Sequence, residues 1–457
     1  MSDYTPSRHA TRQEGMSRRT LLKTAVAGGT LAILGGALTS CAPGAAVPAA
    51  ATPVAPAEAP KPEAAAPGAI EFMDWGVIAN TPLETAINAF KERTGKEVKV
   101  WPVAARYEDK MRTLLAAGTT PDVMRVNDDY VVGYASKGQL RDLMPYITKA
   151  DWKREDMFEK IYDFALKEGH YWVISAGNQP RLIYYNKNMF DEAGIPYPPS
   201  DWDPDKGWTW DDFLQTAKAL TKGEEQFGCA VYHDTGWEQT WSMNNGGPGI
   251  YSEDGLKFTL ADPEGIEAMQ WGADLTCVHQ VQPTRGLLGQ FNANQLFIGG
   301  KLAMVFTATT TSVSYRRDIK DFDWDVTSVP MRKRRWTEGS LICFCIPKPA
   351  KNPDGGWELL EWMTTEEMGK MFATERYFIP IRKSAAVLVP DDKPPKNVHL
   401  FVEGNRYHKS VNFAENTERA RFIYRPQLDL VYTCKQTAEE VLTALRPEVE
   451  AALAGQF

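Results

Sequence analysis

Two short runs of polar and aromatic side chains follow predicted strands near the start of the folded part of the chain. The first run is Asp74-Trp75, and the second is Asn127-Asp128-Asp129-Tyr130. Carboxylates and amides hydrogen-bond ligand groups, and aromatic faces stack on flat apolar surfaces. The residue types therefore indicate binding chemistry. The alternative interpretation is structural, because Asp and Asn after strands also form turns and cap helices.

The elements that position these residues alternate between strand and helix. Residues 70–76, 98–103 and 121–126 are predicted strands; a helix begins after Thr81 and another covers residues 107–117. This alternation predicts a parallel sheet with helices on its faces. Such sheets bind ligands beyond the carboxyl ends of their strands, so both polar runs should approach one crevice.

The first 69 residues predict export rather than a folded domain. Arg18-Arg19 precedes an uncharged Gly/Ala-rich run, which ends in Leu38-Thr39-Ser40-Cys41. Residues 1–41 thus resemble a Tat-type lipoprotein signal peptide with Cys41 as the lipidation site. Residues 42–69 are rich in Ala and Pro and predict an extended linker. Together they predict a lipid-anchored protein on the extracytoplasmic face of the cell membrane, in the periplasm or at the cell surface.

Composition narrows the class of the remaining chain. The protein has 457 residues, and the part after the linker is too long for one compact core, which predicts two domains. Hydrophobic residues make up 43% and charged residues 24%, as in soluble globular proteins. The net charge of -8 argues against nucleic-acid binding, which normally needs a basic excess.

The cysteines predict thiols rather than a disulfide framework. Beyond Cys41 there are five, namely Cys229, Cys277, Cys343, Cys345 and Cys434. Cys343 and Cys345 share one face of a predicted strand and should not bond each other. Tat substrates fold before export, in a reducing compartment, so we expect all five to remain free thiols.

Three sequence blocks resemble family 1 extracellular solute-binding proteins of ABC importers, the group that includes maltose-binding protein. The matching residues are Tyr185-Asn186-Lys187, Phe190, Ala193-Gly194, Pro198-Pro199, Thr209-Trp210-Asp211, residues 217–221, residues 297–304 and residues 357–372. The insertion over residues 200–207 departs from the family's short loop. The blocks occur in the family's order from residue 70 to the C-terminus.

The resemblance implies an α/β, two-lobed periplasmic-binding-protein-like fold (type II), with discontinuous lobes joined by hinge crossovers. Lobe 1 would comprise residues 70–179 and 340–382, and lobe 2 residues 180–339 and 383–457. The crossovers would lie near Gln179, Gly339 and Arg382, and the ligand would be enclosed between the lobes.

The resemblance also extends the set of candidate ligand-binding residues. The full set is Asp74, Trp75, Asn127, Asp128, Asp129, Tyr130, Gln179, Trp237, Glu238, Trp241, Asn245, Thr309, Arg421 and Tyr424. Trp237 and Trp241 are expected to stack on ligand, although their four-residue spacing also suits one packed helix face. Threonines at 307, 309 and 310 stand where maltose-binding protein places an aromatic, which departs from a maltose-like pose.

The leading hypothesis is a monomeric, lipid-anchored receptor that captures a small solute, a sugar or oligosaccharide, for ABC importer permease subunits. It would have no catalysis and no cofactor. One alternative keeps the fold and binds a polyamine or other cation through carboxylates and cation–π contacts; another is a secreted glycosidase with two carboxylates. Asp201, Asp203, Asp205 and Asp212 faintly copy a calcium loop, but Pro204 and the late Gly207 count against it, and no metal is expected.

Overall fold

The computed structural model describes residues 68–456 except residues 77, 104–105, 151, 165, 168, 204, 233–235 and 387–391. The predicted signal peptide with Cys41, and residues 42–67 of the predicted linker, lie outside the described residues. No helix within the described part of the chain is long and apolar enough to cross a membrane.

The first half of the fold, called lobe 1 here, begins with the predicted alternation. Strand β1 (Ile70–Trp75) pairs in parallel with β2 (Val98–Val103) and β3 (Val123–Val126). The lobe's helices are α2 (Pro82–Thr94), α3 (Tyr107–Ala117), α4 (Asp128–Ser136), α5 (Met144–Lys149), α6 (Glu159–Phe164), α14 (Pro353–Met363) and α15 (Glu366–Thr374), with a small hairpin of β4 (Leu166–Lys167) and β5 (His170–Tyr171). Pro82 at the first position of α2 and Gly95 in left-handed conformation after it fix that helix's ends.

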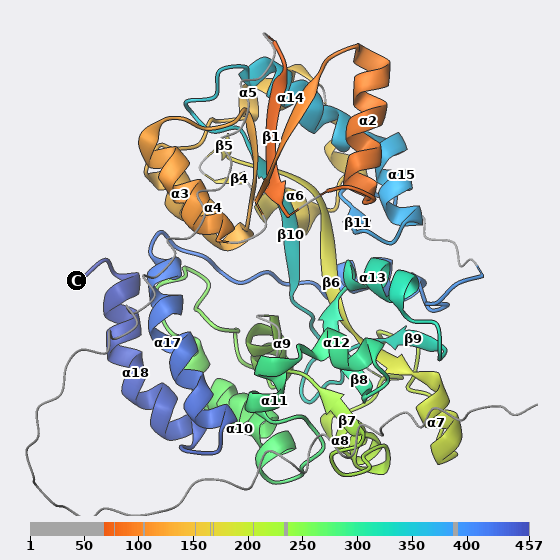
Figure 1. Ribbon diagram of the computed structural model, residues 1–457. Coiled ribbons are helices and arrows are strands. Elements are labelled where there is room, and N and C mark those ends of the chain that lie inside the picture. The colour runs from red at the N-terminus through yellow and green to blue at the C-terminus, as the bar shows by residue number, and fades with distance from the viewer. Residues whose placement is uncertain are drawn as a thin grey trace, which may run out of the picture. The chain divides into compact units, whose positions relative to one another are not determined.

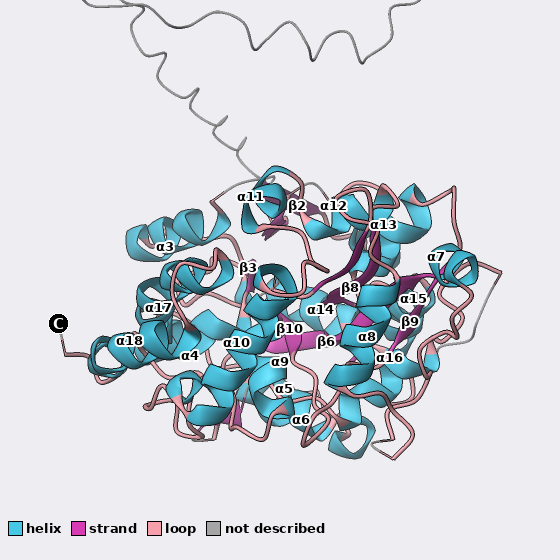
Figure 2. Ribbon diagram, turned by 90° about the horizontal axis from the view of Figure 1, so that it is seen from below, coloured by secondary structure: helices cyan, strands magenta, loops and turns pink. Residues whose placement is uncertain are grey.

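The second half, called lobe 2, is larger and more helical. Its strands are β7 (Phe227–Ala230), β8 (Leu302–Ala308) and β9 (Trp324–Thr327). Its helices are α7 (Lys187–Ala193), α8 (Trp210–Ala219), α9 (Gly236–Asn244), α10 (Pro263–Cys277), α11 (Arg285–Gln290), α12 (Ala293–Ile298), α13 (Thr311–Asp318), α16 (His399–Glu403), α17 (Thr417–Tyr432) and α18 (Ala438–Leu453). In both ribbon views α17 and α18 lie at the opposite end of the lobe from α7 (Figures 1 and 2).

One long strand belongs to both halves. The first part of β6 (Ile174–Asn186) pairs with β10 (Gly339–Cys345) and β11 (Ile379–Pro380), whereas residues 181–186 pair with β8 and β9. The strand order of the nine-stranded sheet is β2-β1-β3-β10-β6-β8-β7, with β9 and β11 also on β6. Strand β6 therefore carries the chain from lobe 1 to lobe 2, and β10 begins where it returns (Figure 1).

Two separate hydrophobic cores stand on either side of this passage. Phe72, Met124 and Phe344 belong to the core of lobe 1. Tyr184 and Phe306 belong to that of lobe 2. In β6 the first core ends at residue 176 and the second begins at residue 182, so residues 177–181 lie between the lobes.

The cysteines differ from the prediction of five thiols. Cys277, the last residue of α10, forms a disulfide with Cys434, which follows α17. Cys229, Cys343 and Cys345 are buried free thiols. The two bonded residues are 157 apart in sequence, and only the packing of α10 against α17 and α18 brings their Cα atoms to 5.8 Å.

Candidate functional site

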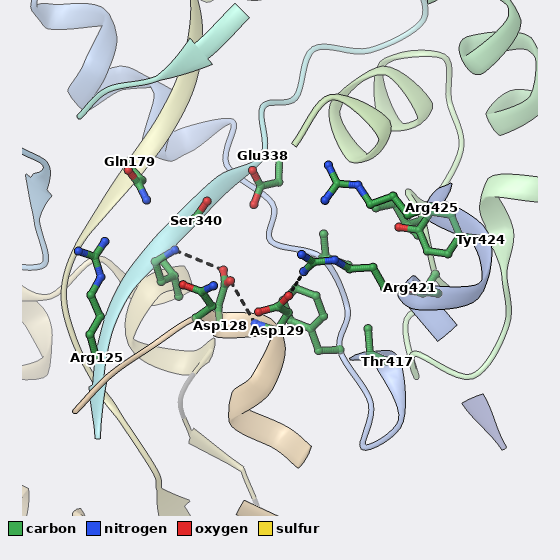
Figure 3. Close-up of a pocket in the computed structure, with 16 residues that line it drawn as sticks. Arg125, Asp128, Asp129, Gln179, Glu338, Ser340, Thr417, Arg421, Tyr424 and Arg425 are labelled. Atoms are coloured by element: carbon green, nitrogen blue, oxygen red, sulfur yellow. Dashed lines mark hydrogen bonds and ion pairs between the residues drawn. The ribbon is translucent and has the colours of Figure 1, made fainter. Parts of the chain in front are cut away.

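A pocket lies between the two lobes, at the carboxyl ends of the lobe 1 strands (Figure 3). The space between its walls measures about 810 Å³, including open solvent at its mouth. Its lining residues are Arg125, Asn127, Asp128, Asp129, Ser340 and Leu341 from lobe 1, Ile250, Tyr251, Val411, Phe413, Thr417, Arg421, Tyr424 and Arg425 from lobe 2, and Gln179 and Glu338 at the crossovers. The end of β3, the start of β10 and the first halves of α4 and α17 thus supply most of its polar groups.

Six predicted residues line this pocket: Asn127, Asp128, Asp129, Gln179, Arg421 and Tyr424. Asp74 and Trp75, at the end of β1, do not belong to its lining. Asp74 is buried, with Oδ1 3.4 Å from Arg125 Nη1, and Trp75 stacks on Tyr107 at a ring distance of 4.4 Å. Asp74 therefore orients a pocket arginine rather than lining the pocket.

Trp237 and Trp241 correct the sequence prediction, because both lie in the core of lobe 2. Each is 0% exposed. The Trp241 ring meets Phe306 edge-on at 4.9 Å, and the Trp237 ring lies 5.6 Å from Tyr432. All residues of α9 are buried, so packing occupies both faces of the helix. The expectation that these rings stack on ligand is wrong, and their spacing is a packing pattern.

Four further predicted residues are also buried away from the pocket lining. Tyr130 packs near Tyr134 on α4. Asn245 Nδ2 donates to Glu267 Oε2 at 2.8 Å, and Thr309 Oγ1 donates to the Pro180 carbonyl at 2.7 Å. Glu238 lies beneath the pocket, with Oε1 3.7 Å from Arg425 Nε. Their polar groups thus support the scaffold or a pocket side chain.

Asp128 is a buried carboxyl at the first turn of α4. Its Oδ1 accepts the Asp129 backbone N–H at 3.1 Å, and its Oδ2 accepts the Leu341 N–H at 3.3 Å. Burial, and after it the nearby Glu338 carboxylate, raise the pKa of Asp128 to about 7. Glu338 itself forms a buried ion pair with Arg181. Two carboxyl groups therefore face the pocket beside one buried guanidinium.

Asp129 and Arg421 form an ion pair across the pocket (Figure 3). Asp129 belongs to α4 of lobe 1 and Arg421 to α17 of lobe 2, so this pair joins the lobes. Burial raises the pKa of Asp129 to about 7, and Arg421 opposes the shift. Among the described residues, no group hydrogen-bonds Asp129 Oδ1. That oxygen is buried and its hydrogen-bonding capacity is unsatisfied.

Sequence reasoning missed several pocket residues, among them Arg125, Glu338 and Arg425. Arg425 follows Arg421 by four positions on α17 and so shares its face, a signal that the sequence contains. Glu338 directly precedes Gly339 at the start of β10, the predicted crossover. Arg125 carries no such signal, because its position near the end of β3 is typical of any strand residue.

In the segment that resembles a calcium loop, the carboxylates of Asp201, Asp203 and Asp212 contact other groups of the same segment. Asp212 accepts hydrogen bonds from Thr209 N and Oγ1 as a capping box of α8. Lys206 Nζ lies 3.4 Å from Asp203 Oδ2 and 3.8 Å from Asp201 Oδ2. Within the described ranges, no group of three or more His, Cys, Asp or Glu side chains could hold a metal ion.

Two α/β lobes that share a crossover strand and enclose a polar pocket define a solute-binding protein. The family model for bacterial extracellular solute-binding proteins matches residues 85–402, and the chain belongs to this family. A putative binding protein of Brucella abortus is 23% identical over 295 residues, which cover 64% of this chain and 69% of the relative. The erythritol/L-threitol-binding protein of Mycolicibacterium smegmatis is 32% identical over 168 residues, covering 33% of this chain and 34% of the relative.

Solved structures confirm the predicted two-lobed fold. An ABC substrate-binding protein of Listeria monocytogenes in complex with cycloalternan superimposes with a TM-score of 0.77, at 22% identity, and covers 84% of this chain and 98% of that one. The maltotriose-binding protein of Thermus thermophilus, bound with maltotriose, gives 0.70 at 18% identity and covers 84% and 99%. The chain therefore has the mixed α/β, two-lobed periplasmic-binding-protein-like fold.

Proposed function

We propose that the protein is the substrate-binding component of an ABC importer, that it captures a neutral, hydroxyl-rich solute of the sugar or polyol class between its lobes, and that it performs no catalysis. The observation that carries the proposal is the composition of the pocket, where Asp129 and Glu338 face arginines and the Gln179 amide. Vicinal hydroxyls both donate and accept, so they suit a site that offers acceptors and donors together. Relatives named for erythritol/L-threitol and for arabinooligosaccharide support this solute class.

Closure of the lobes provides the signal to the importer in this proposal. The passages at Gln179, Gly339 and Arg382 would act as the hinge. A ligand that contacts both lobes binds the closed form more tightly and shifts the population toward it. The permease subunits would then recognise the closed monomer.

We further propose that the folded part stands outside the cytoplasmic membrane on a lipid attached to Cys41. The twin-arginine run, the lipobox-like Leu38-Thr39-Ser40-Cys41 and the Ala/Pro-rich linker support this anchor. The Cys277–Cys434 disulfide supports the same compartment, because disulfides persist in oxidising surroundings. Metabolic labelling with a radioactive fatty acid, lost in Cys41→Ala, tests the anchor.

The polyamine alternative fits this pocket less well. Arg125, Arg421 and Arg425 all line it, and each would repel a multivalent cation. A glycosidase reading has no support from the relatives, which are named as binding proteins.

Calorimetry at pH 8.0 tests the proposed function. The titrants are C4–C6 polyols, pentoses, hexoses, di- to pentasaccharides, putrescine and spermidine. We expect at least one neutral solute to bind with a Kd of about 10 µM or below. Asp129→Asn should weaken it by about tenfold, because one hydrogen bond to a charged group is lost. Exposed Arg419 lies on α17 outside the pocket lining, so Arg419→Ala is the matched control. Binding of polyamines alone, or of nothing in the panel, would refute the proposal.

A further inference from the structure

One face of α17 carries charged side chains at helical spacing. Glu418, Arg421 and Arg425 stand at positions i, i+3 and i+7, so they lie on neighbouring turns of one face. Glu418 pairs with Arg112 of α3, and Arg421 pairs with Asp129 of α4. Both partners belong to lobe 1. We call the Arg112–Glu418 and Asp129–Arg421 pairs the interlobe ladder.

Neighbouring groups hold the ladder in place. Asp109 forms a second ion pair with Arg112, and its other oxygen lies 2.7 Å from Arg106 Nε. The backbones of the two lobes also approach each other here. A Cβ added at Gly133 of α4 would lie 3.0 Å from the carbonyl oxygen of Glu415, which stands just before α17. The two lobes are therefore in direct contact along α4 and α17.

The ladder bounds the pocket on one side, and the crossover strands bound it on the other. Gln179 on β6 and Ser340 on β10 line the wall opposite Arg421. Figure 1 shows β6 and β10 at the centre of the fold and α4 and α17 together at one edge. In Figure 3, Arg421 reaches from α17 to Asp129 between these walls. A ligand that continued past α17 would have to replace the Asp129–Arg421 pair.

We propose that the interlobe ladder limits ligand length, so that the site takes a short acyclic polyol or a single sugar ring and rejects a chain of rings. The proposal rests on the proposed function and makes Arg421 and Glu418 specificity-determining residues. A longer ligand that displaces Arg421 leaves the buried Asp129 without its cation, which is costly. It also gains no stacking on Trp237 or Trp241, because both rings are fully buried in the core.

The test compares two sets of probes by calorimetry at pH 8.0 on the mature, oxidised protein. The compact set is erythritol, L-threitol, xylitol, sorbitol, arabinose and glucose; the extended set is maltotriose, maltopentaose, cellotriose and arabinotriose. For the native sequence we expect the best compact probe to bind at least about 100-fold more tightly than the best extended probe, a ratio at the low end for breaking a buried pair, because Arg421 is partly exposed.

The variants ask whether the ladder causes that ratio. Arg421→Ala should lower the ratio of affinities for compact and extended probes at least about tenfold. Glu418→Gln should also lower this ratio, although Glu418 does not line the pocket. Arg419→Ala removes the same charge from the same helix and should leave the ratio unchanged. Circular dichroism and melting temperature verify that each variant is folded.

The outcomes separate the two proposals. Extended probes that bind the native protein as tightly as compact ones overturn the length limit and leave the solute class standing. A ratio that stays the same in folded Arg421→Ala and Glu418→Gln also overturns it. Absence of binding by every probe in both sets refutes the proposed function and, with it, this inference.

Discussion

The Cys277–Cys434 disulfide allows a prediction whose size can be calculated from the chain. The bond closes a loop with a sequence separation of 157 residues, which includes the whole return through lobe 1 over β10, α14 and α15. In the chain-entropy description a cross-link of this length removes about 17 cal/mol/K from the unfolded state, or about 5 kcal/mol at 25 °C. This value is an upper bound, because residual structure in the unfolded chain reduces the effect.

The perturbation is the double variant Cys277→Ser/Cys434→Ser. We expect its free energy of unfolding in urea to fall by about 2 to 5 kcal/mol relative to the oxidised protein. A reducing agent should lower the stability of the native sequence by a similar amount and leave the double variant unchanged. Cys343→Ser is the control: this buried thiol is unpaired, so the variant should lose stability on reduction by the same amount as the native sequence.

A thiol count supplies the independent measurement. When the chain after the predicted linker is denatured without a reducing agent, three thiols should react, namely Cys229, Cys343 and Cys345. After reduction, five thiols should react. Five thiols before reduction would refute the disulfide and restore the sequence-based expectation. Equal stability of the native protein and the double variant would refute the loop-closure reasoning even if the bond forms.

Three further predictions concern the pocket, the core and the crossover. Because the pKa of Asp128 is raised to about 7, the folded protein binds more protons than the unfolded one between about pH 4 and 7, so the contribution of this carboxyl to stability falls as pH rises, by at most about 4 kcal/mol; in urea titrations at pH 5 and pH 8, Asp128→Asn should reduce the difference in stability and leave the share of Asp129, whose pKa is also raised to about 7, and an unchanged difference would contradict the assignment. Trp241→Leu should lower the free energy of unfolding by about 3 kcal/mol and change ligand Kd less than about threefold, because the ring packs in the core; a large loss of affinity in a stable variant would return this ring to the site. Gly177→Ala places a Cβ 2.3 Å from the Ile379 carbonyl oxygen and should cost about 2 kcal/mol or more, whereas Gly289→Ala meets nothing within 4 Å and should be neutral or stabilising.

Local patterns in the sequence predicted the first strands and helices of lobe 1, and the family resemblance supplied the two-lobed fold. The start of α2 after Thr81 and the strand–helix alternation both depend on residues close in the chain. The family blocks added the order of elements across both lobes. The long shared strand β6 was less visible, because its residues 174–186 mix polar and apolar side chains across the passage between two cores.

The site was only half predictable, because burial decides between binding and packing. Asp128 and Trp241 both stand on elements near the crevice, yet Asp128 lines the pocket and Trp241 lies inside lobe 2. If α9 had one polar face, the sequence would have shown that Trp237 and Trp241 point the other way, into the core. All residues of α9 are buried, so the helix carries no such pattern. Partners such as Asp129 and Arg421, 292 residues apart, meet only when both lobes are assembled.

The disulfide and the proposed twin-arginine signal make different demands on folding, and the structure indicates how both can be met. A chain that crosses the membrane folded must form lobe 2 while Cys277 and Cys434 are still thiols. Helix α10 carries Cys277 at its end and packs against α17 and α18, whose connection holds Cys434, so the fold itself places the two sulfurs together. Oxidation after export then adds stability to an already folded lobe. The Cys277→Ser/Cys434→Ser protein should therefore still fold and bind ligand with native affinity; a double variant that cannot fold would mean that the bond must form before the lobe does, which export in the folded state does not allow.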